Sequence, residues 1–65
     1  MKKTDFEKIK EMINEIPQSA FIFNVDADGW EADDGTIRLF KEYNIELTVE
    51  TFTLLSKLLD EEYYK

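Results

Sequence analysis

Residues 20–32, which read Ala-Phe-Ile-Phe-Asn-Val-Asp-Ala-Asp-Gly-Trp-Glu-Ala, carry the clearest signal for β-structure in the chain and so decide its fold class. Residues 20–25 are rich in aromatic and β-branched side chains, which favour a strand. The next four residues, Asp26-Ala27-Asp28-Gly29, are typical of a turn in which Gly29 takes a positive φ angle. Residues 30–32 would form a short return strand. The stretch therefore predicts a β-hairpin.

A helix is expected before the hairpin, over residues 5–16. Its apolar residues recur with the period of a helix and form one narrow stripe. They are Phe6, Ile9, Met12, Ile13 and Ile16. Thr4 and Glu7 have the spacing of a capping box at its first turn. Pro17 should end the helix, because the residue before a proline is driven out of the helical region.

A second helix is expected over residues 49–63, with Thr48 as its cap and with Leu47 and Phe52 as a hydrophobic staple. Its core-facing stripe consists of Val49, Phe52, Leu55, Leu59 and Tyr63. Leu54 and Leu58 widen the stripe beyond half of the circumference, which is more apolar surface than one packed face of a small domain needs. We therefore expect these two leucines to be exposed, and we consider a homodimer that forms through them.

Residues 36–47 fit two structures. As a strand, their odd positions are largely apolar, but Phe40 and Lys41 violate the alternation. As a helix over residues 36–43, their apolar side chains cover one side and the charged ones cover the other. Asn44 would then be the left-handed residue after the helix, with Ile45 packing back on it. We prefer the helix and treat residues 33–35 as a break between it and the hairpin.

These elements together predict the fold class. The order α-β-β-α-α describes an α+β protein, a small single acidic domain over residues 1–65. Two strands are not stable alone in water, so the helices should pack on the short hairpin. The alternative is that residues 36–47 supply a strand instead of a helix.

The composition favours a binding protein over an enzyme. The 65 residues include neither cysteine nor histidine, so no disulfide, no zinc–thiolate site and no histidine base can form. Gly29 and Gly35 are the only glycines, which is too few for a phosphate-binding loop. A chain of this length also leaves little room for a catalytic cleft. We predict no enzymatic activity and no cofactor.

The net charge of −7 is unevenly placed along the chain. Residues 11–37 contain seven acids and no base, whereas the remaining residues contain eight of each. Such a chain repels nucleic acids and anionic membranes and attracts a basic protein surface. The apolar runs are too short to cross a membrane and no signal peptide is evident, so we expect a cytoplasmic protein.

The acids of the hairpin region form the candidate binding site. Along an extended backbone, alternate residues lie about 6.5–7 Å apart, a spacing comparable to that of successive phosphates on a nucleic-acid strand. Trp30 is suited to anchor a contact, because tryptophan is enriched at binding hot spots, and it is equally suited to a core position. The alternative is that the acids only form a solvated face. The candidate partner-binding residues are Asp26, Asp28, Trp30, Glu31, Asp33 and Asp34.

In size, acidity and lack of cysteine and histidine, the chain resembles the small inhibitors that phages and other mobile elements make, including nucleic-acid mimics. The resemblance is one of composition and involves no specific motif. It implies an inhibitor that occupies the nucleic-acid-binding site of an enzyme or regulator.

The pattern Asn24-x-Asp26-x-Asp28-Gly29 matches the first half of an EF-hand calcium loop. The second half fails, because Gly35 stands at the position where such loops need a bidentate glutamate. An aspartate-rich turn explains the same residues, since aspartate favours turns. We predict no tight metal site and keep a weak Ca²⁺-binding module at residues 24–29 as an alternative.

Overall fold

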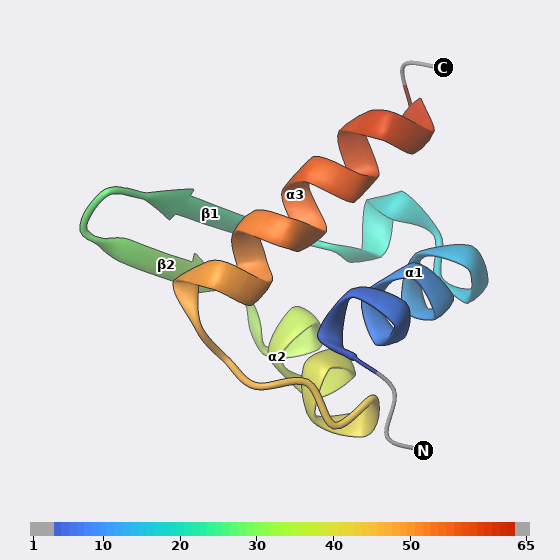
Figure 1. The fold of residues 1–65 in the computed structure, drawn as a ribbon. Coiled ribbons are helices and arrows are strands. Elements are labelled where there is room, and N and C mark those ends of the chain that lie inside the picture. The colour runs from blue at the N-terminus through green and yellow to red at the C-terminus, as the bar shows by residue number, and fades with distance from the viewer. Residues whose placement is uncertain (1–3, 64–65) are drawn as a thin grey trace.

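The computed structural model describes residues 4–63, in which helices pack against a two-stranded antiparallel hairpin (Figure 1). The elements are α1 (Asp5–Glu15), a 3₁₀ turn (Gln18–Ala20), β1 (Phe23–Asp26), β2 (Gly29–Ala32), α2 (Asp34–Glu42) and α3 (Val49–Tyr63). The predicted order α-β-β-α-α and the α+β class are confirmed. The hairpin extends to one side of the helices, with its turn far from α1 (Figure 1).

The first and last helices of the chain, α1 and α3, begin at the predicted caps. In α1, the Thr4 hydroxyl accepts a hydrogen bond from the Glu7 backbone N–H at 3.3 Å. In α3, Thr48 and Thr51 cap each other: the N–H of Thr51 donates to the Thr48 hydroxyl at 3.2 Å, and the N–H of Thr48 donates to the Thr51 hydroxyl at 3.1 Å. These bonds satisfy donors that a helix start would otherwise leave unpaired.

The hairpin is shorter at its start than predicted. Residues 20–22 do not belong to β1, because the N–H of Ala20 donates to the Pro17 carbonyl and the N–H of Phe21 donates to the Gln18 carbonyl. These bonds close a 3₁₀ turn after Pro17 and engage the backbone before the strand can begin. The turn itself follows the prediction, with Gly29 at φ 149°.

Residues 36–47 contain helix, so the alternative strand is wrong. After α2, the N–H of Ile45 donates to the Phe40 carbonyl at 2.8 Å and the N–H of Asn44 donates to the Lys41 carbonyl at 3.1 Å. With Asn44 at φ 56°, these two bonds form a Schellman motif, and Ile45 packs back into the core as predicted.

The predicted break at residues 33–35 is also wrong. The Asp33 carboxylate accepts a hydrogen bond from the Thr36 N–H at 3.0 Å, which makes Asp33 the N-cap of α2. Asp34 and Gly35 already lie in the first turn of the helix. Aspartate serves turns and helix caps through the same local hydrogen bond, and here the cap prevails.

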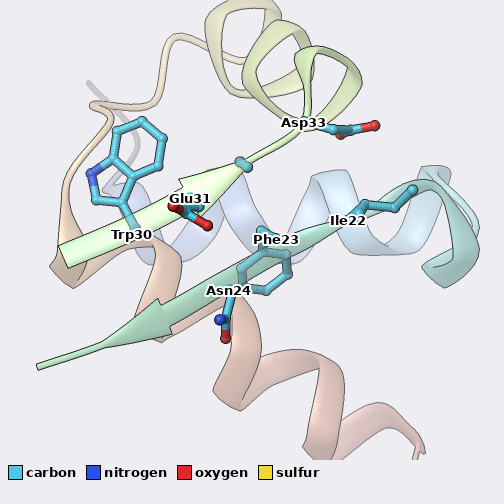
Figure 2. Close-up of a pocket in the computed structure, with 7 residues that line it drawn as sticks. Ile22, Phe23, Asn24, Trp30, Glu31 and Asp33 are labelled. Atoms are coloured by element: carbon cyan, nitrogen blue, oxygen red, sulfur yellow. The ribbon is translucent and has the colours of Figure 1, made fainter. Parts of the chain in front are cut away.

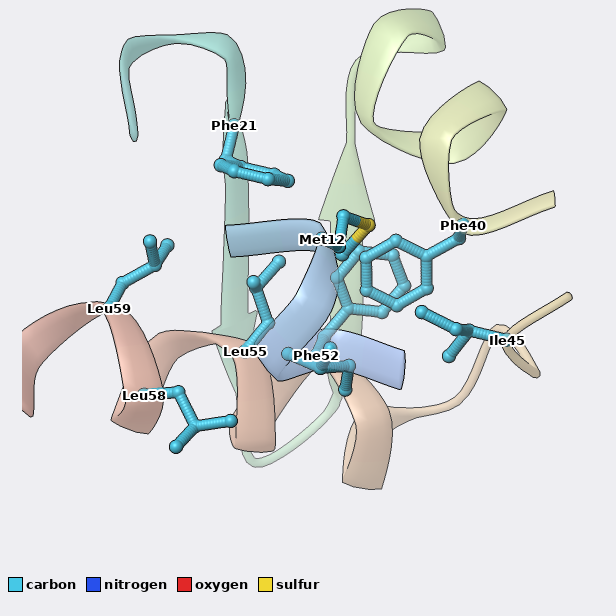
Figure 3. Close-up of a cluster of buried hydrophobic side chains, with 9 residues drawn as sticks. Met12, Phe21, Phe40, Ile45, Phe52, Leu55, Leu58 and Leu59 are labelled. Atoms are coloured by element: carbon cyan, nitrogen blue, oxygen red, sulfur yellow. The ribbon is translucent and has the colours of Figure 1, made fainter. Parts of the chain in front are cut away.

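Phe52 lies at the centre of the core. Its ring stacks on Phe40 of α2 at a centroid distance of 4.3 Å and on Trp30 of β2 at 4.4 Å, and it meets Phe23 of β1 at 5.7 Å. Figure 3 shows the Phe40 and Phe52 rings together, with the leucines of α3 alongside. The buried hydrophobic residues are Ile9, Met12, Phe21, Phe40, Ile45, Phe52, Leu55, Leu58 and Leu59.

Thr36 ties the start of the hairpin to α2. Its side chain is fully buried, and its hydroxyl accepts from the Ile22 N–H at 2.9 Å and donates to the Ile22 carbonyl at 3.3 Å. The same carbonyl accepts from the Asp33 N–H at 3.0 Å. These bonds satisfy the backbone at Ile22 and fix the angle at which the chain leaves the hairpin.

Several apolar side chains differ from the predicted exposure. Leu58 is only 8% exposed and belongs to the core, and Leu54 is half-buried against it, so the expected exposed surface at these residues is wrong. Val49, which we assigned to the core-facing stripe, is 40% exposed, and Phe6 of α1 is 45% exposed beneath the Lys10 ammonium. The side chain of Tyr63 lies outside the described residues. Self-association remains a prediction, but Leu58 offers no free surface for it.

The two glycines provide a matched pair of substitutions. Gly29→Ala is expected to lower the free energy of unfolding by about 1 kcal/mol, because φ 149° is strained for any residue with a Cβ atom. Gly35→Ala should leave this free energy unchanged or raise it by up to about 1 kcal/mol, since the new Cβ would meet its nearest atom at 3.6 Å within a helix. Urea denaturation measures both, and equal stability of Gly29→Ala and wild type would contradict the prediction.

Candidate functional site

The hairpin has one covered and one exposed face. Phe23 pairs with Ala32 and Val25 pairs with Trp30, and these four side chains pack against the core. Between them, exposed Asn24 pairs with exposed Glu31, and exposed Asp26 pairs with Gly29. Side chains alternate between the faces of a strand, so the exposed positions share the face away from the helices.

This outer face and its turn carry most of the predicted site. One shallow hollow is lined by Asn24, Asp26, Asp28, Gly29, Trp30 and Glu31. A second is lined by Ile22, Phe23, Asn24, Trp30, Glu31, Ala32 and Asp33 (Figure 2). Of the six predicted residues, five therefore line connected parts of one surface, and Asp34 lines neither hollow. We call Asp26, Asp28, Glu31 and Asp33 the acidic face.

Two of these carboxylates also hold the backbone. Asp26 accepts a hydrogen bond from the Asp28 N–H at 2.8 Å, which tightens the hairpin turn, and Asp33 caps α2. Within residues 4–63, the carboxylates of Asp28, Glu31 and Asp34 make no hydrogen bond or ion pair. All five acids are exposed, so their charge is presented to solvent without a neutralising partner.

Trp30 contributes to the core and to the outer surface at once. Its ring stacks on Phe52 with an angle of 19° between the ring planes. The residue is only partly buried and lines both hollows of the hairpin. The two roles weighed for Trp30, core residue and surface anchor, are therefore compatible in this position.

The half calcium loop has the geometry of a turn. Asn24, Asp26 and Asp28 line one hollow, but one Asp26 oxygen is engaged by the Asp28 N–H. Within residues 4–63, no three histidine, cysteine, aspartate or glutamate side chains are grouped so that they could hold a metal ion. The observed bond is that of an aspartate turn, which explains the sequence pattern without a cation.

Away from the hairpin, a hydrogen bond that the sequence did not reveal joins α1 to the end of α2. The Tyr43 hydroxyl donates to Glu15 at 2.6 Å. This bond raises the pKa of Tyr43 above its ordinary value of 10.0, and partial burial and the charges of Glu15, Glu42 and Glu11 raise it further. Nearby, the Lys8 ammonium donates to the carbonyl of Asn44 at 2.8 Å, at the negative end of α2.

No family model, curated protein or solved structure matched the chain. Within residues 4–63, no helix has the length and apolar character needed to span a membrane.

The Tyr43–Glu15 bond predicts a pH dependence of stability. The protonated hydroxyl stabilises the fold, so its contribution is complete below the unfolded pKa of about 10 and is lost as the pH rises through the higher folded pKa. The free energy of unfolding should therefore fall above pH 10, and less steeply in Tyr43→Phe. Carbon NMR of labelled tyrosines should show the Tyr43 pKa decrease in Glu15→Gln, and an ordinary pKa in both proteins would contradict this.

The turn geometry predicts no tight calcium site. Millimolar Ca²⁺ should raise the melting temperature no more than Mg²⁺ does at matched ionic strength, because a real site would stabilise the fold by mass action. Thermal unfolding followed by circular dichroism measures this. A shift that is specific to Ca²⁺ and disappears in Asp28→Asn would show that the half loop binds the ion.

Proposed function

We propose that the chain is an acidic binding domain that docks on a basic surface of a partner protein. The observation that carries this proposal is the outer face of the hairpin, where Asp26, Asp28, Glu31 and Asp33 are exposed on one surface. No basic residue occurs between positions 11 and 37 to neutralise them. Unpaired exposed charges of one sign attract an oppositely charged surface and speed the encounter with it.

The rigid support of this face favours binding. The inner side chains of the hairpin pack on Phe52 and its neighbours, while hydrogen bonds fix the turn at Asp26 and the helix start at Asp33. The carboxylates are therefore held on an ordered backbone before any partner arrives. Less conformational entropy is lost on association when a surface is already ordered.

The finer form of the proposal is that the partner surface is one that otherwise binds nucleic acid, so that the domain acts as an inhibitor. Glu31 points outward on β2, and Asp33, the N-cap of α2, follows two residues later in extended backbone. On β1 the alternate outward positions are Asn24 and Asp26, of which only Asp26 is charged. Such positions lie about 6.5–7 Å apart, as successive phosphates do. A basic site shaped to follow a phosphate backbone would therefore meet a similar charge spacing between Glu31 and Asp33, with Asp26 as a third charge on the neighbouring strand.

Neutralising three residues of the acidic face together with the neighbouring Asp34 tests this proposal. In the variant with Asp26, Asp28, Asp33 and Asp34 changed to Asn, association with a captured partner should slow by about tenfold or more, with a smaller effect on dissociation. Asparagine keeps the oxygen that accepts at the turn and at the helix cap, so stability should change by no more than about 1 kcal/mol. Partners captured from lysate can be measured by biosensor at increasing salt, with DNA or RNA as competitor.

The matched control removes the same charge elsewhere. Glu42, Glu46, Glu50 and Glu61 are exposed and lie outside the hairpin, and their change to glutamine removes four charges as well. This control should associate within about twofold of wild type. If both quadruple variants slow association equally, only net charge matters, and the acidic face has no special role. If nucleic acid does not compete, the proposal that the domain imitates nucleic acid is wrong, while the proposal that it binds a basic partner is unaffected.

A further inference from the structure

The hairpin has a free edge along β1. The Asp33 N–H donates to the Ile22 carbonyl, which is one of the two bonds of a hydrogen-bonded pair, whereas the Ile22 N–H donates to the Thr36 hydroxyl. Such pairs alternate along an antiparallel ladder, and Asn24–Glu31 and Asp26–Gly29 are therefore hydrogen-bonded as well. The backbone N–H and C=O groups of Phe23 and Val25 must then point away from β2, and in the described part of the chain no second strand receives them.

A groove runs between this edge and α3. One part of it is lined by Val25, Asp26, Ala27, Val49, Thr53, Ser56 and Lys57. A neighbouring part is lined by Gln18, Ser19, Phe21, Phe23, Ser56, Leu59 and Asp60. Ser56 lines both parts, so the groove follows the edge from the 3₁₀ turn to the hairpin turn. It combines unpaired backbone groups on one wall with a mixed apolar and hydroxyl-bearing helix surface on the other.

The shape of the groove specifies an extended backbone. Only another strand can pair with the N–H and C=O groups of Phe23 and Val25 in register, and alternate side chains of that strand would point inward and outward. Inward side chains would lie beside Val25 and the helix residues Thr53 and Ser56, where small apolar or hydroxyl groups fit. Lys57 lines the same wall and disfavours a basic residue at these positions.

Charge specifies the outward side chains. A strand added beside β1 lies about 4.8 Å from it, so its outward residues would stand next to Asn24 and Asp26. Glu31 on β2 lies about one Debye length away at physiological salt. Lysine or arginine at outward positions is therefore favoured. A second copy of this chain is disfavoured as the occupant, because each copy carries a net charge of −7.

We propose that β1 pairs with an extended segment of the partner in which basic residues alternate with small apolar or hydroxyl residues. This inference rests on the proposed function and specifies how the basic partner is held. The backbone bonds along β1 supply part of the affinity, the groove beside α3 selects the inward residues, and the acidic face selects the outward ones.

The test uses a defined probe, a capped eight-residue peptide in which lysine alternates with valine or threonine. Val25→Pro removes one outward N–H without touching the ladder to β2, which a proline at a strand edge permits. We expect Val25→Pro to bind the peptide about three- to tenfold more weakly by fluorescence anisotropy, as the loss of one backbone hydrogen bond predicts. The matched control, Ala32→Pro, alters the free edge of β2 and should bind like wild type.

Two modified peptides make the test independent of the stability of the protein variants. One carries N-methyl groups on the valine and threonine amides, the other on the lysine amides. An antiparallel strand uses the first set of amides, and a parallel strand uses the second, so one of the two peptides should bind at least about tenfold more weakly. Both retain every charge of the parent peptide.

The outcomes separate this inference from the proposed function. Equal binding of the parent and both N-methylated peptides would overturn the pairing at β1, and so would no detectable binding of the parent peptide at millimolar concentration. Suppose that the peptides overturn the strand pairing but that the Asp26, Asp28, Asp33 and Asp34 variant binds the lysate partner more weakly than wild type. The proposed function, docking on a basic surface, would then hold without the strand pairing. Weaker binding of one N-methylated peptide and of Val25→Pro, with Ala32→Pro unchanged, would support the inference.

Discussion

The structure depends on the aromatic stack around Phe52. This ring comes from α3, yet it contacts Phe40 of α2 and Trp30 and Phe23 of the two strands, so one side chain joins three separate parts of the chain. Truncating a buried phenylalanine typically costs about 3–5 kcal/mol, a large share of the roughly 5–15 kcal/mol that stabilises a whole domain. In a chain with no cysteine, no disulfide can replace that packing.

The position of the stack determines where charge can be placed. Because Phe52 and its neighbours cover only the inner face of the hairpin, the outer face has no covering element among residues 4–63. Carboxylates are costly to bury and cost little on such a face. Asp26 and Asp33 combine two roles there, since each holds a backbone N–H while leaving its charge in solvent. The local bonds that build the fold thus also fix the acidic face.

The sequence predicted features that depend on neighbours within a few residues. The caps at Thr4 and Thr48, the left-handed Asn44 and the turn at Gly29 are all present, because each rests on a local hydrogen bond or φ angle. The burial of Leu58 was missed, because helical periodicity does not reveal that α1 and both strands surround α3. The Tyr43–Glu15 bond was missed for the same reason, since it links residues 28 positions apart. Five of the six predicted site residues do line one surface, as strand alternation and turn chemistry require.

The acidic face and the free edge of β1 have one physical origin. A two-stranded sheet necessarily exposes unpaired backbone groups, which invite pairing with other chains, and proteins commonly guard such edges with charge. Here the charges on the hairpin itself are acidic, with Asp26 on β1 and Asp28 in the adjoining turn, while Lys57 of α3 is the one base that lines the groove beside the edge within the described residues. Two copies that approach edge to edge would bring like charges together, whereas a basic strand would gain from the same charges. Acidity at this edge therefore opposes self-pairing and favours a basic partner by a single electrostatic effect, which is why the two properties occur on the same hairpin.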